Sequence, residues 1–291
     1  MKSAALLISA LWYLSLPAAA EDAATAADAV RLPLWEVGVG AGGSFGSAYP
    51  AADEQSLKGL PFPVLIYRGA LLRIGGDNLV AGRLFKSRRL ELDVSAGGSF
   101  NTDSDDVEIR EGMPDLDYLF ELGPELEIRL DDFSDPSRQL KLEIPLRAAF
   151  SSDFTDVSAR GLVFAPELEY EQYAFFGTPF QVDLSITPIF ANEKFLDYFY
   201  DVAPEFARAG RPAFDAGGGY LGTELGVGVR RDKGRYQFFF GGNLTAHQGA
   251  ENENSPLFER DVSYSVYAAF VRFLWASERR APDQSTGAAS F

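Results

Sequence analysis

The sequence contains no cysteine, so neither a disulfide bond nor a thiolate ligand or nucleophile is available to the folded protein. After residue 20 it also lacks an apolar run of about eighteen residues, the length that a transmembrane helix needs. The core or the sheet must therefore hold this chain together without covalent staples. Zinc-thiolate sites, thiol catalysis and a helical membrane span are excluded.

Positive charge is scarce as well: 26 lysines and arginines stand against 42 aspartates and glutamates, a formal net charge of −16. Removal of a leader that contains Lys2 makes it −17 (−16 − 1). A chain this acidic has no general electrostatic reason to bind nucleic acid, and its acidity argues against a basic patch for a membrane surface. We therefore expect no nucleic-acid partner.

The first twenty residues have the three parts of a secretory signal peptide. Lys2 gives a short positive region, residues 4–16 form an apolar core, and Ala18 and Ala20 form the small-residue pattern of a cleavage site. We therefore predict that the chain is exported. The expected division is a signal peptide at 1–20, a periplasmic N-terminal segment at 21–33, one folded domain at 34–275 and a periplasmic tail at 276–291.

The stretch DYLFELGPELEIRL, residues 117–130, alternates between charged and apolar side chains. Glu121 and Glu125 share one parity, whereas Phe120 and Leu122 share the other. A helix with 3.6 residues per turn would mix the two sets, but a pleated strand separates them onto opposite faces. The stretch is therefore predicted to be a strand with one oily face and one charged face.

The same period of two returns along most of the chain. Together with 28 glycines and 13% aromatic residues, it indicates an all-β protein rich in turns. The alternation persists over about ten to fourteen residues at a time, longer than a usual strand of a soluble protein. The predicted strands lie at 34–46, 62–85 (interrupted), 88–100, 117–130, 138–150, 161–173, 180–190, 216–231, 235–247 and 262–275.

The predicted connections come in two sizes: short ones such as 177–178 and 232–234, and longer polar ones such as 192–215. If all long loops lie at one end, the strands alternate consistently and number ten, an even number, as in bacterial outer-membrane barrels. A hairpin at GGDN, residues 75–78, together with a further strand at FLDYFY, residues 195–200, would give twelve instead.

Two architectures produce this alternation. A soluble periplasmic sandwich buries its apolar face between two sheets. A membrane barrel instead needs long strands, because a tilted strand has to cross about 30 Å of hydrocarbon, and it places aromatic residues in girdles at the two interfaces. The aromatic residues near the predicted strand ends favour the barrel. They are Trp35, Phe45, Phe100, Tyr118, Phe120, Phe150, Tyr173, Phe175, Phe176, Phe190, Tyr236, Phe273 and Trp275.

In a closed antiparallel transmembrane β-barrel the apolar side chains face lipid and the charged ones face the lumen. The sheet must close, because backbone groups at a free edge would have no hydrogen-bond partner in hydrocarbon. Ten strands enclose a narrow space, so long side chains of both signs are expected to fill it as an ion network and leave a plugged or very narrow pore. The expected lumen residues are Glu91, Asp93, Glu121, Glu125, Glu127, Arg129, Lys141, Glu143, Arg147, Glu167, Glu169 and Arg230.

Several stretches stand in one order along nearly the whole mature chain: FGSAYP at 45–50, YR at 67–68, REGMPDLDYLFELGPELEI at 110–128, DYFYDVAPEFARAGRPAFDAGGG at 197–219 and SPLFERD at 255–261. With these stretches the chain resembles the MipA/OmpV family of outer-membrane proteins, also called MltA-interacting proteins. It departs from the family pattern at Asp201, where the resemblance implies glycine, and after Trp275, where a tail follows the last predicted strand.

The resemblance implies an outer-membrane location, with short periplasmic turns and longer extracellular loops. For some members it implies a scaffold role that links a murein hydrolase to a peptidoglycan synthase, and other members are connected with antibiotic sensitivity or adhesion. Contacts with murein enzymes would use the periplasmic turns, residues 21–31 or the tail, since the other surfaces face lipid, lipopolysaccharide or the exterior.

His247 is the only histidine, and it closes a predicted strand that contains Asn243 and Thr245. Ser263 and Ser265 lie on the next predicted strand, so a Ser-His-Asn lipid hydrolase is one hypothesis. No motif surrounds either serine. A polar residue where a strand meets an outer loop is therefore the preferred interpretation of His247.

The run NTDSDDVEIREGMPD holds Asp103, Asp105, Asp106 and Glu108, and hard divalent cations bind clustered oxygen ligands. An EF-hand loop that begins at Asp103 needs glycine at its sixth position and glutamate at its twelfth, but this chain has Glu108 and Pro114 there. A solvated loop is therefore preferred to a metal site.

Three other features are interpreted as structural. GVGAGGS, residues 38–44, lacks the GK[ST] ending and the following helix of a phosphate-binding loop, so its glycines are expected to permit curvature or close approach. Glu121 and Glu125 lie on one strand without a cleft and do not make a glycosidase pair. Gly112 and Pro114 mark the passage from a loop into a strand, with partner contact as a secondary hypothesis.

The sequence thus predicts a single-domain outer-membrane β-barrel that is not an enzyme, with no catalytic residue, no cofactor and no metal site assigned. Its expected role is that of a scaffold for peptidoglycan-remodelling enzymes. The alternatives are a narrow pore for small solutes or antibiotics and an outer-membrane lipid hydrolase.

Overall fold

The structure is a computed structural model. It describes residues 32–69, 72–74, 80–82, 85–87, 89–131, 135, 137–279 and 281. The expected signal peptide at 1–20, nearly all of the segment 21–33 and most of the tail 276–291 lie outside the described residues. Within the described part, no helix is both long and apolar enough to cross a membrane.

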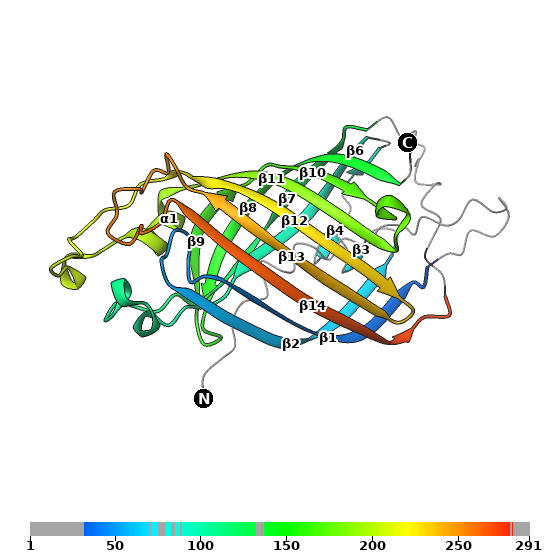
Figure 1. Cartoon of the computed structure of the whole chain (residues 1–291), viewed down its shortest axis with the longest axis horizontal. Helices are drawn as coiled ribbons and strands as arrows, with labels where there is room; N and C mark the ends of the chain where they lie inside the picture. The colour runs from blue at the N-terminus through cyan, green and yellow to red at the C-terminus, as the bar shows by residue number, and fades with distance from the viewer. Residues whose placement is uncertain are drawn as a thin grey trace.

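One antiparallel sheet makes up most of the described chain (Figure 1). Its strands are β1 (Trp35–Ser47), β2 (Gln55–Arg68), β3 (Leu72–Ile74), β4 (Val80–Gly82), β5 (Phe85–Lys86), β6 (Leu90–Ser99), β7 (Tyr118–Arg129), β8 (Arg138–Ser152), β9 (Val157–Phe164), β10 (Glu167–Gln172), β11 (Phe180–Ala191), β12 (Gly219–Lys233), β13 (Tyr236–Ala246) and β14 (Val262–Ala276). The order across the sheet is β4-β3-β2-β1-β14-β13-β12-β11-β10-β8-β7-β6-β5, and β9 pairs with β8 and β11.

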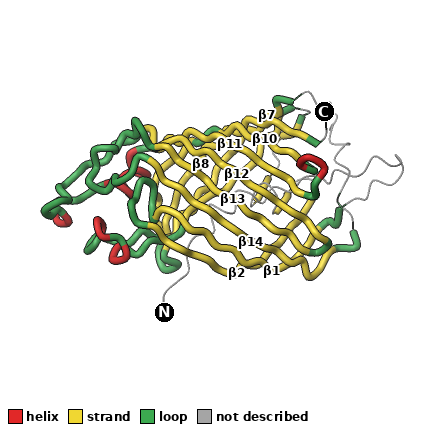
Figure 2. The backbone as a smooth tube through the Cα atoms, in the orientation of Figure 1, coloured by secondary structure: helices red, strands yellow, loops and turns green. Residues whose placement is uncertain are grey.

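The first and last long strands pair with each other, from Glu36 opposite Ala276 to Gly46 opposite Ser265. The sheet curls around a long interior, which we call the lumen, and its strands run obliquely (Figures 1 and 2). Long connections gather at one end, the loop end, and short turns at the other, the turn end (Figure 2). The two sizes of connection therefore lie at opposite ends, as the sequence predicted.

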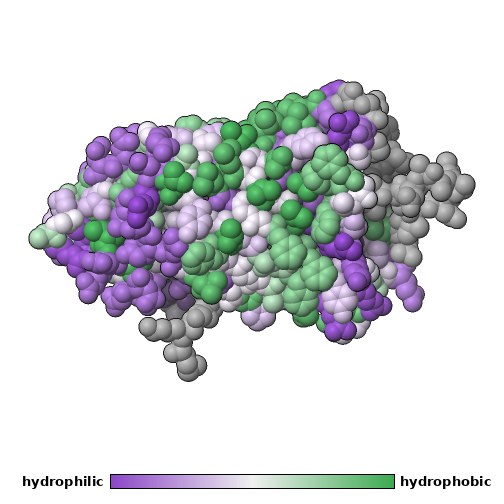
Figure 3. Space-filling view, in the orientation of Figure 1, coloured by the Kyte–Doolittle hydropathy of each residue, from purple (hydrophilic) through white to green (hydrophobic). Residues whose placement is uncertain are grey.

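The sheet is polar inside and apolar outside. Neighbouring residues on one strand show this directly: Asp183 is 3% exposed, whereas Leu184 is 48% exposed. On β7, Glu125 is 5% exposed and Leu122 is 51% exposed, so the alternation of residues 117–130 sorts as predicted. Figure 3 shows apolar residues across the middle of the molecule, with the loop end strongly hydrophilic.

The interpretation of residues 62–85 as one interrupted strand is wrong. β2 begins at Gln55, inside residues 47–61, where the alternation predicts a long polar loop, and ends at Arg68. β3 then runs antiparallel to β2, and β4 runs antiparallel to β3. Pro61 and Pro63 hid the strand, because proline lacks the N–H that a strand ladder uses. The hairpin turn proposed at 75–78 lies outside the described residues.

The stretch FLDYFY is not a further strand. It belongs to α1 (Glu193–Tyr200), which lies in the long connection between β11 and β12. Phe195 and Phe199, like Leu196 and Tyr200, are spaced four residues apart, so one face of α1 is buried. This face packs into an apolar core at the loop end. Other buried members of this core are Tyr49, Val107, Leu116, Leu119, Val163, Val202 and Leu257.

Glycine and proline shape two strands. The expected strand 161–173 is divided into β9 and β10 around Ala165 and Pro166, because Pro166 has no N–H to donate. The glycines of GVGAGGS lie in β1, where a Cβ added to Gly40 would stand 2.5 Å from the ring of Phe62. The expected role in close approach is therefore confirmed at this position.

Candidate functional site in the lumen

An ionic group projects into the lumen from the neighbouring strands β8 and β10. The ammonium of Lys141 lies 2.8 Å from Glu169, 2.9 Å from Glu171 and 3.2 Å from Glu143. Lys141 and Glu169 stand opposite each other in the ladder, and all these side chains point inward because of the period of two. The lysine is almost fully buried, so its charge is tolerated only because the three carboxylates surround it.

A second ionic group surrounds Arg147, which is 2% exposed. Its Nε donates to the hydroxyl of Ser95 at 3.1 Å, and its terminal nitrogens lie 3.4 Å from Glu121 and 3.8 Å from Glu125. Glu121 and Glu125, on the neighbouring strand β7, thus both face the same arginine. They act as structural counter-ions, as the sequence analysis preferred over a glycosidase pair.

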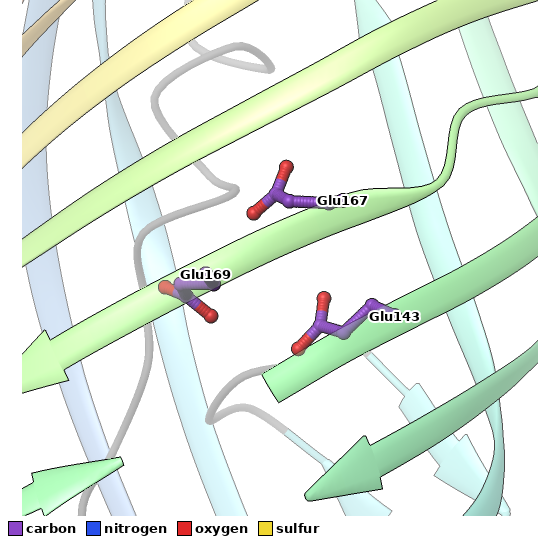
Figure 4. Close-up of side chains that lie close together, drawn as sticks. All are labelled: Glu143, Glu167 and Glu169. Carbon is purple, nitrogen blue, oxygen red and sulfur yellow. The ribbon is translucent and has the colours of Figure 1, made fainter. Parts of the chain in front are cut away.

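Glu143, Glu167 and Glu169 bring three carboxylates together on β8 and β10 (Figure 4). A second group of three consists of Glu169, Glu171 and Asp183. Hard cations take such oxygen ligands, and these are the residues of the described chain best placed to hold one. Lys141 already forms ion pairs with Glu143 and Glu169 of the first group and with Glu169 and Glu171 of the second, so we assign no metal to them.

A polar row crosses one wall of the lumen nearer the loop end. Glu143 lies opposite Glu167, Thr187 opposite Glu224, and Glu224 opposite Thr245. The hydroxyl of Thr187 donates to Glu167 at 2.7 Å and that of Thr245 to Glu224 at 3.4 Å. The register of five neighbouring strands therefore brings Glu167 and Glu224 to one height of the lumen.

This row borders a cavity of about 270 Å³ beneath α1. Glu167 and Glu224 line it, together with rings and aliphatic side chains from α1 and the loops, such as Phe195, Tyr198 and Leu116. The sequence analysis missed Glu224 and the aromatic cover. Glu224 and Arg230 share one parity in TELGVGVR, so the alternation contained that signal. Nothing in the alternation indicated α1.

Hydrogen bonds from several loops hold α1 over the cavity. Tyr200 donates to the carbonyl of Pro50 at 3.0 Å, and Tyr198 donates to that of Asp117 at 3.2 Å. The buried Arg110 donates to the carbonyl of Phe199 at 3.2 Å. Burial, followed by the charge of Asp117, raises the pKa of Tyr198 to about 12, so this phenol stays neutral and keeps its proton to donate.

The structure brings His247 and Ser263 together, as the hydrolase hypothesis required. Nε2 of His247 lies 2.9 Å from the hydroxyl of Ser263, and Nδ1 lies 2.9 Å from the carbonyl of Leu221. A carbonyl only accepts, so Nδ1 donates to it and the neutral ring accepts from Ser263 at Nε2. Burial lowers the pKa of His247, which favours this neutral form.

The surroundings of this pair are those of a structural bridge. The Ser263 hydroxyl also accepts the backbone N–H of Ala51 at 2.9 Å, which ties the loop after β1 to β14. The carbonyl of Leu221, rather than Asn243, orients the imidazole. Asn243, Thr245 and Ser265 line the cavity.

The acidic run of residues 103–108 forms two short 3₁₀ turns, η2 (Ser104–Asp106) and η3 (Glu108–Arg110). Its carboxylates serve local hydrogen bonds, since Asp103 accepts the N–H of Asp105 at 3.0 Å. The groups of three carboxylates found in the described chain include none of them. Gly112 has a φ of +77°, which suits the expected passage from the loop toward β7.

Comparison with protein families gives a match over most of the chain. A protein-family model described as MltA-interacting protein MipA matches residues 39–273. No curated protein matches the chain. Among solved structures, the crystal structure of the Ralstonia pickettii toluene transporter TbuX is similar, with 10% sequence identity and a TM-score of 0.29, over 83% of this chain and 89% of that chain. We build nothing on this weak similarity.

Proposed function

We propose that this chain, which belongs to the family of MltA-interacting protein MipA, is an outer-membrane β-barrel with a filled lumen. The barrel holds peptidoglycan-remodelling enzymes at the envelope. The observation that carries the membrane assignment is the inverted polarity of the sheet. Leucines such as Leu184 point outward and charged residues such as Lys141 are buried. Exposure of these apolar side chains to water is unfavourable, whereas their contact with hydrocarbon is favourable.

In this proposal the sheet closes into a barrel between β4, β5 and β6. β5 pairs with β6, and β4 lies beside β6. A free edge in hydrocarbon would leave backbone groups without partners, so closure is required. With β4 and β5 as one interrupted crossing, and β9 and β10 as another, the barrel has twelve strands. This is the number of the second alternative, but it is reached without a strand at FLDYFY, because residues 55–86 supply two more crossings than expected.

The lumen of this barrel is blocked twice along its axis. Near the loop end α1 and its loops cover the cavity, and further in the Lys141 and Arg147 groups fill the space. We therefore expect purified protein in liposomes to give no leakage of sugars in a swelling assay. A large, stable single-channel conductance in planar bilayers would overturn the filled lumen and favour the alternative of a solute pore.

The scaffold role needs a periplasmic contact surface, and the turn end offers one. The turn between β10 and β11 carries Phe175 and Phe176, and Phe176 is 84% exposed. Ala174 and Phe176 both have positive φ values, +50° and +47°, which L-residues adopt at a cost. An exposed aromatic side chain on a strained turn supports protein contact, because aromatic residues are enriched at interfaces.

Affinity purification from crosslinked envelopes tests this role. We expect the parent protein to capture a murein hydrolase and the Phe176→Ser variant to capture much less of it. Phe154→Ser is the matched control, since Phe154 is 75% exposed and also has a positive φ, but lies at the loop end. Equal capture by Phe176→Ser would remove this turn from the scaffold, and absence of any murein enzyme would overturn the role itself.

We also propose that the protein is not an enzyme. The support is that the Ser263 hydroxyl is engaged by both Ala51 and His247, which suits a structural bridge between a loop and a strand. A lipase assay in mixed micelles decides between the two. Hydrolysis that disappears in His247→Ala, while the folded band on a heat-modifiability gel persists, would establish the hydrolase alternative.

A further inference from the structure

The lining of the cavity beneath α1 includes two carboxylates that form no direct ion pair within the described residues. Glu167 and Glu224 line it, and the hydroxyls of Thr187 and Thr245 are the partners that they meet. Across the part of the chain that the structure describes, neither carboxylate forms an ion pair. Glu121, which lines the same cavity, differs, because Arg147 lies 3.4 Å from it.

Another part of the cavity wall is apolar. Phe195 and Phe199 from α1 line it together with Leu116 and Leu119, and all four side chains are buried. The rings of Phe195 and Phe199 pack edge to face with centroids 5.5 Å apart. One cavity thus joins an anionic wall to an aromatic and aliphatic cover, and the two walls suit different parts of one ligand.

We propose that this cavity binds a small organic cation, an ammonium group attached to one apolar ring. An ionised carboxylate in a confined, poorly hydrated space is costly without a positive partner. An ammonium beside Glu167 and Glu224 supplies that charge. The attached ring then takes the apolar wall, where burial and cation–π attraction favour it. The volume of about 270 Å³ lies just under the ~300–1,000 Å³ of pockets for drug-sized ligands, so one ring fits.

Other ligand classes fit less well. An anion would meet Glu167 and Glu224, while the nearest guanidinium, that of Arg147, is already engaged by Glu121 and Glu125. A bare divalent cation requires six or more oxygen ligands at short distance and gains nothing from an aromatic cover. A neutral ring would use only the apolar wall and would leave both carboxylates without a counter-ion.

Isothermal titration of the full-length protein, folded in a non-ionic detergent, tests the proposal. The probe is benzyltrimethylammonium, with benzyl alcohol as the neutral analogue and benzoate as the anionic one, and each is also titrated into empty micelles. We expect saturable binding of the cation, with benzyl alcohol weaker by roughly tenfold or more and no binding of benzoate.

Variants locate the binding site. The single changes Glu167→Gln and Glu224→Gln each remove a charge and keep the shape, and we expect each to raise the dissociation constant of the probe by roughly tenfold. Glu253→Gln is the matched control, since Glu253 is exposed in the loop between β13 and β14, and its affinity should equal that of the parent. A heat-modifiability gel reports folding of each variant.

Several results would overturn the inference. Equal binding of the cation and benzyl alcohol would show an apolar pocket without charge recognition. Displacement of the probe by Mg²⁺ at a concentration below that of the probe would indicate a metal site. Unchanged affinity in folded Glu167→Gln and Glu224→Gln would place the ligand elsewhere. If either variant fails to fold, the comparison of the three ligands on the parent protein still decides. None of these readouts depends on a murein enzyme, so the scaffold role stands or falls separately.

Discussion

Lys141 shows how a single residue holds the lumen together. Its ammonium lies within 3.2 Å of three carboxylates, and its side chain is 4% exposed. Burial of an ion is tolerated when excellent partners surround it, and removal of one member leaves the others buried without compensation. Stability at this scale therefore depends on matched charges more than on apolar contact.

Replacement of Lys141 by methionine keeps the length of the side chain and removes its charge. We expect Lys141→Met to lower the free energy of unfolding by about 3–5 kcal/mol, because three buried carboxylates lose their cation. Urea unfolding in phospholipid vesicles, followed by tryptophan fluorescence, measures this change. Lys233→Met, at the exposed turn end, is the control and should change little. If Lys141→Met lowered the free energy of unfolding no more than the control does, the proposed importance of the Lys141 ion pairs would be contradicted.

Asp201 caps the C-terminus of α1, the end at which the helix dipole disfavours negative charge. Burial, and then the charge of Asp215, raises the pKa of Asp201 above its ordinary 3.8. A raised pKa means that the folded state holds the proton more tightly than the unfolded chain. Its contribution to stability is therefore complete below the ordinary pKa and is lost as the pH rises through the raised value.

We therefore expect Asp201→Asn to stabilise α1 at neutral pH by about 0.3–1 kcal/mol. Below the ordinary pKa of 3.8 the difference from the parent should vanish. Amide hydrogen exchange of α1, corrected for the intrinsic rate at each pH, measures both values. A gain of the same size at both pH values would show that charge is not the cause.

At the scale of the elements, the position of helix α1 depends on its close approach to a bulge in strand β9. The ladder between β8 and β9 shifts register between Ala149 and Phe150, and Gly161 has a φ of +118°. A Cβ added to Gly161 would stand 2.1 Å from Oδ1 of Asn192 and 2.9 Å from the backbone nitrogen of Phe195. Only glycine satisfies both the backbone angle and this contact.

Gly161→Ala is thus expected to displace α1 and to lower the cost of opening the loop end by about 1–3 kcal/mol. Trypsin cleavage at Lys194, an exposed residue of α1, should become faster, as seen by mass spectrometry of the fragments. Gly177→Ala is the control: its φ of +75° also strains alanine, but no atom lies within 4 Å of the added Cβ. Equal cleavage rates in parent and Gly161→Ala would exclude this role of Gly161.

The long strands were predictable because their period of two spans many residues, as in residues 117–130. Helix α1 was not predictable, since the rings of FLDYFY stand at positions that suit either a strand or a short helix. Packing against Tyr49 and Leu257 determines that the segment is a helix. β2 was misjudged because Pro61 and Pro63 lie within it. Lys141 and Arg147 were predicted as lumen residues, as were most of their partners, but Glu171 and Ser95 were not. The cavity depends on α1 and was not predicted.

At the scale of the whole molecule, inverted polarity places a belt of apolar side chains on the outside (Figure 3). Leu184 lies within β11 and points outward, and Val157 points outward at the loop end of β9. The cost of a charge on the lipid face depends on its depth: about 2–4 kcal/mol for arginine at the midplane and about 0–1 kcal/mol near an interface.

Arginine at these two positions tests the proposed membrane setting. We expect Leu184→Arg to lower the free energy of unfolding in phospholipid vesicles by about 2–4 kcal/mol, and Val157→Arg to lower it by at most about 1 kcal/mol. Urea titration with the parent protein alongside measures both. Equal tolerance of the two substitutions would mean that the belt does not lie in hydrocarbon.

In the outer-membrane setting proposed above, the leucines and phenylalanines that suit the bilayer also determine how the chain must travel. Between the inner membrane and its destination, a polypeptide with this alternation is surrounded by water, from which its outward apolar residues are not sheltered. Exposed apolar strands then associate with one another. It therefore has to cross the aqueous compartment unfolded and escorted by a holding chaperone. Loss of that escort should lead to its degradation in transit rather than to a soluble form.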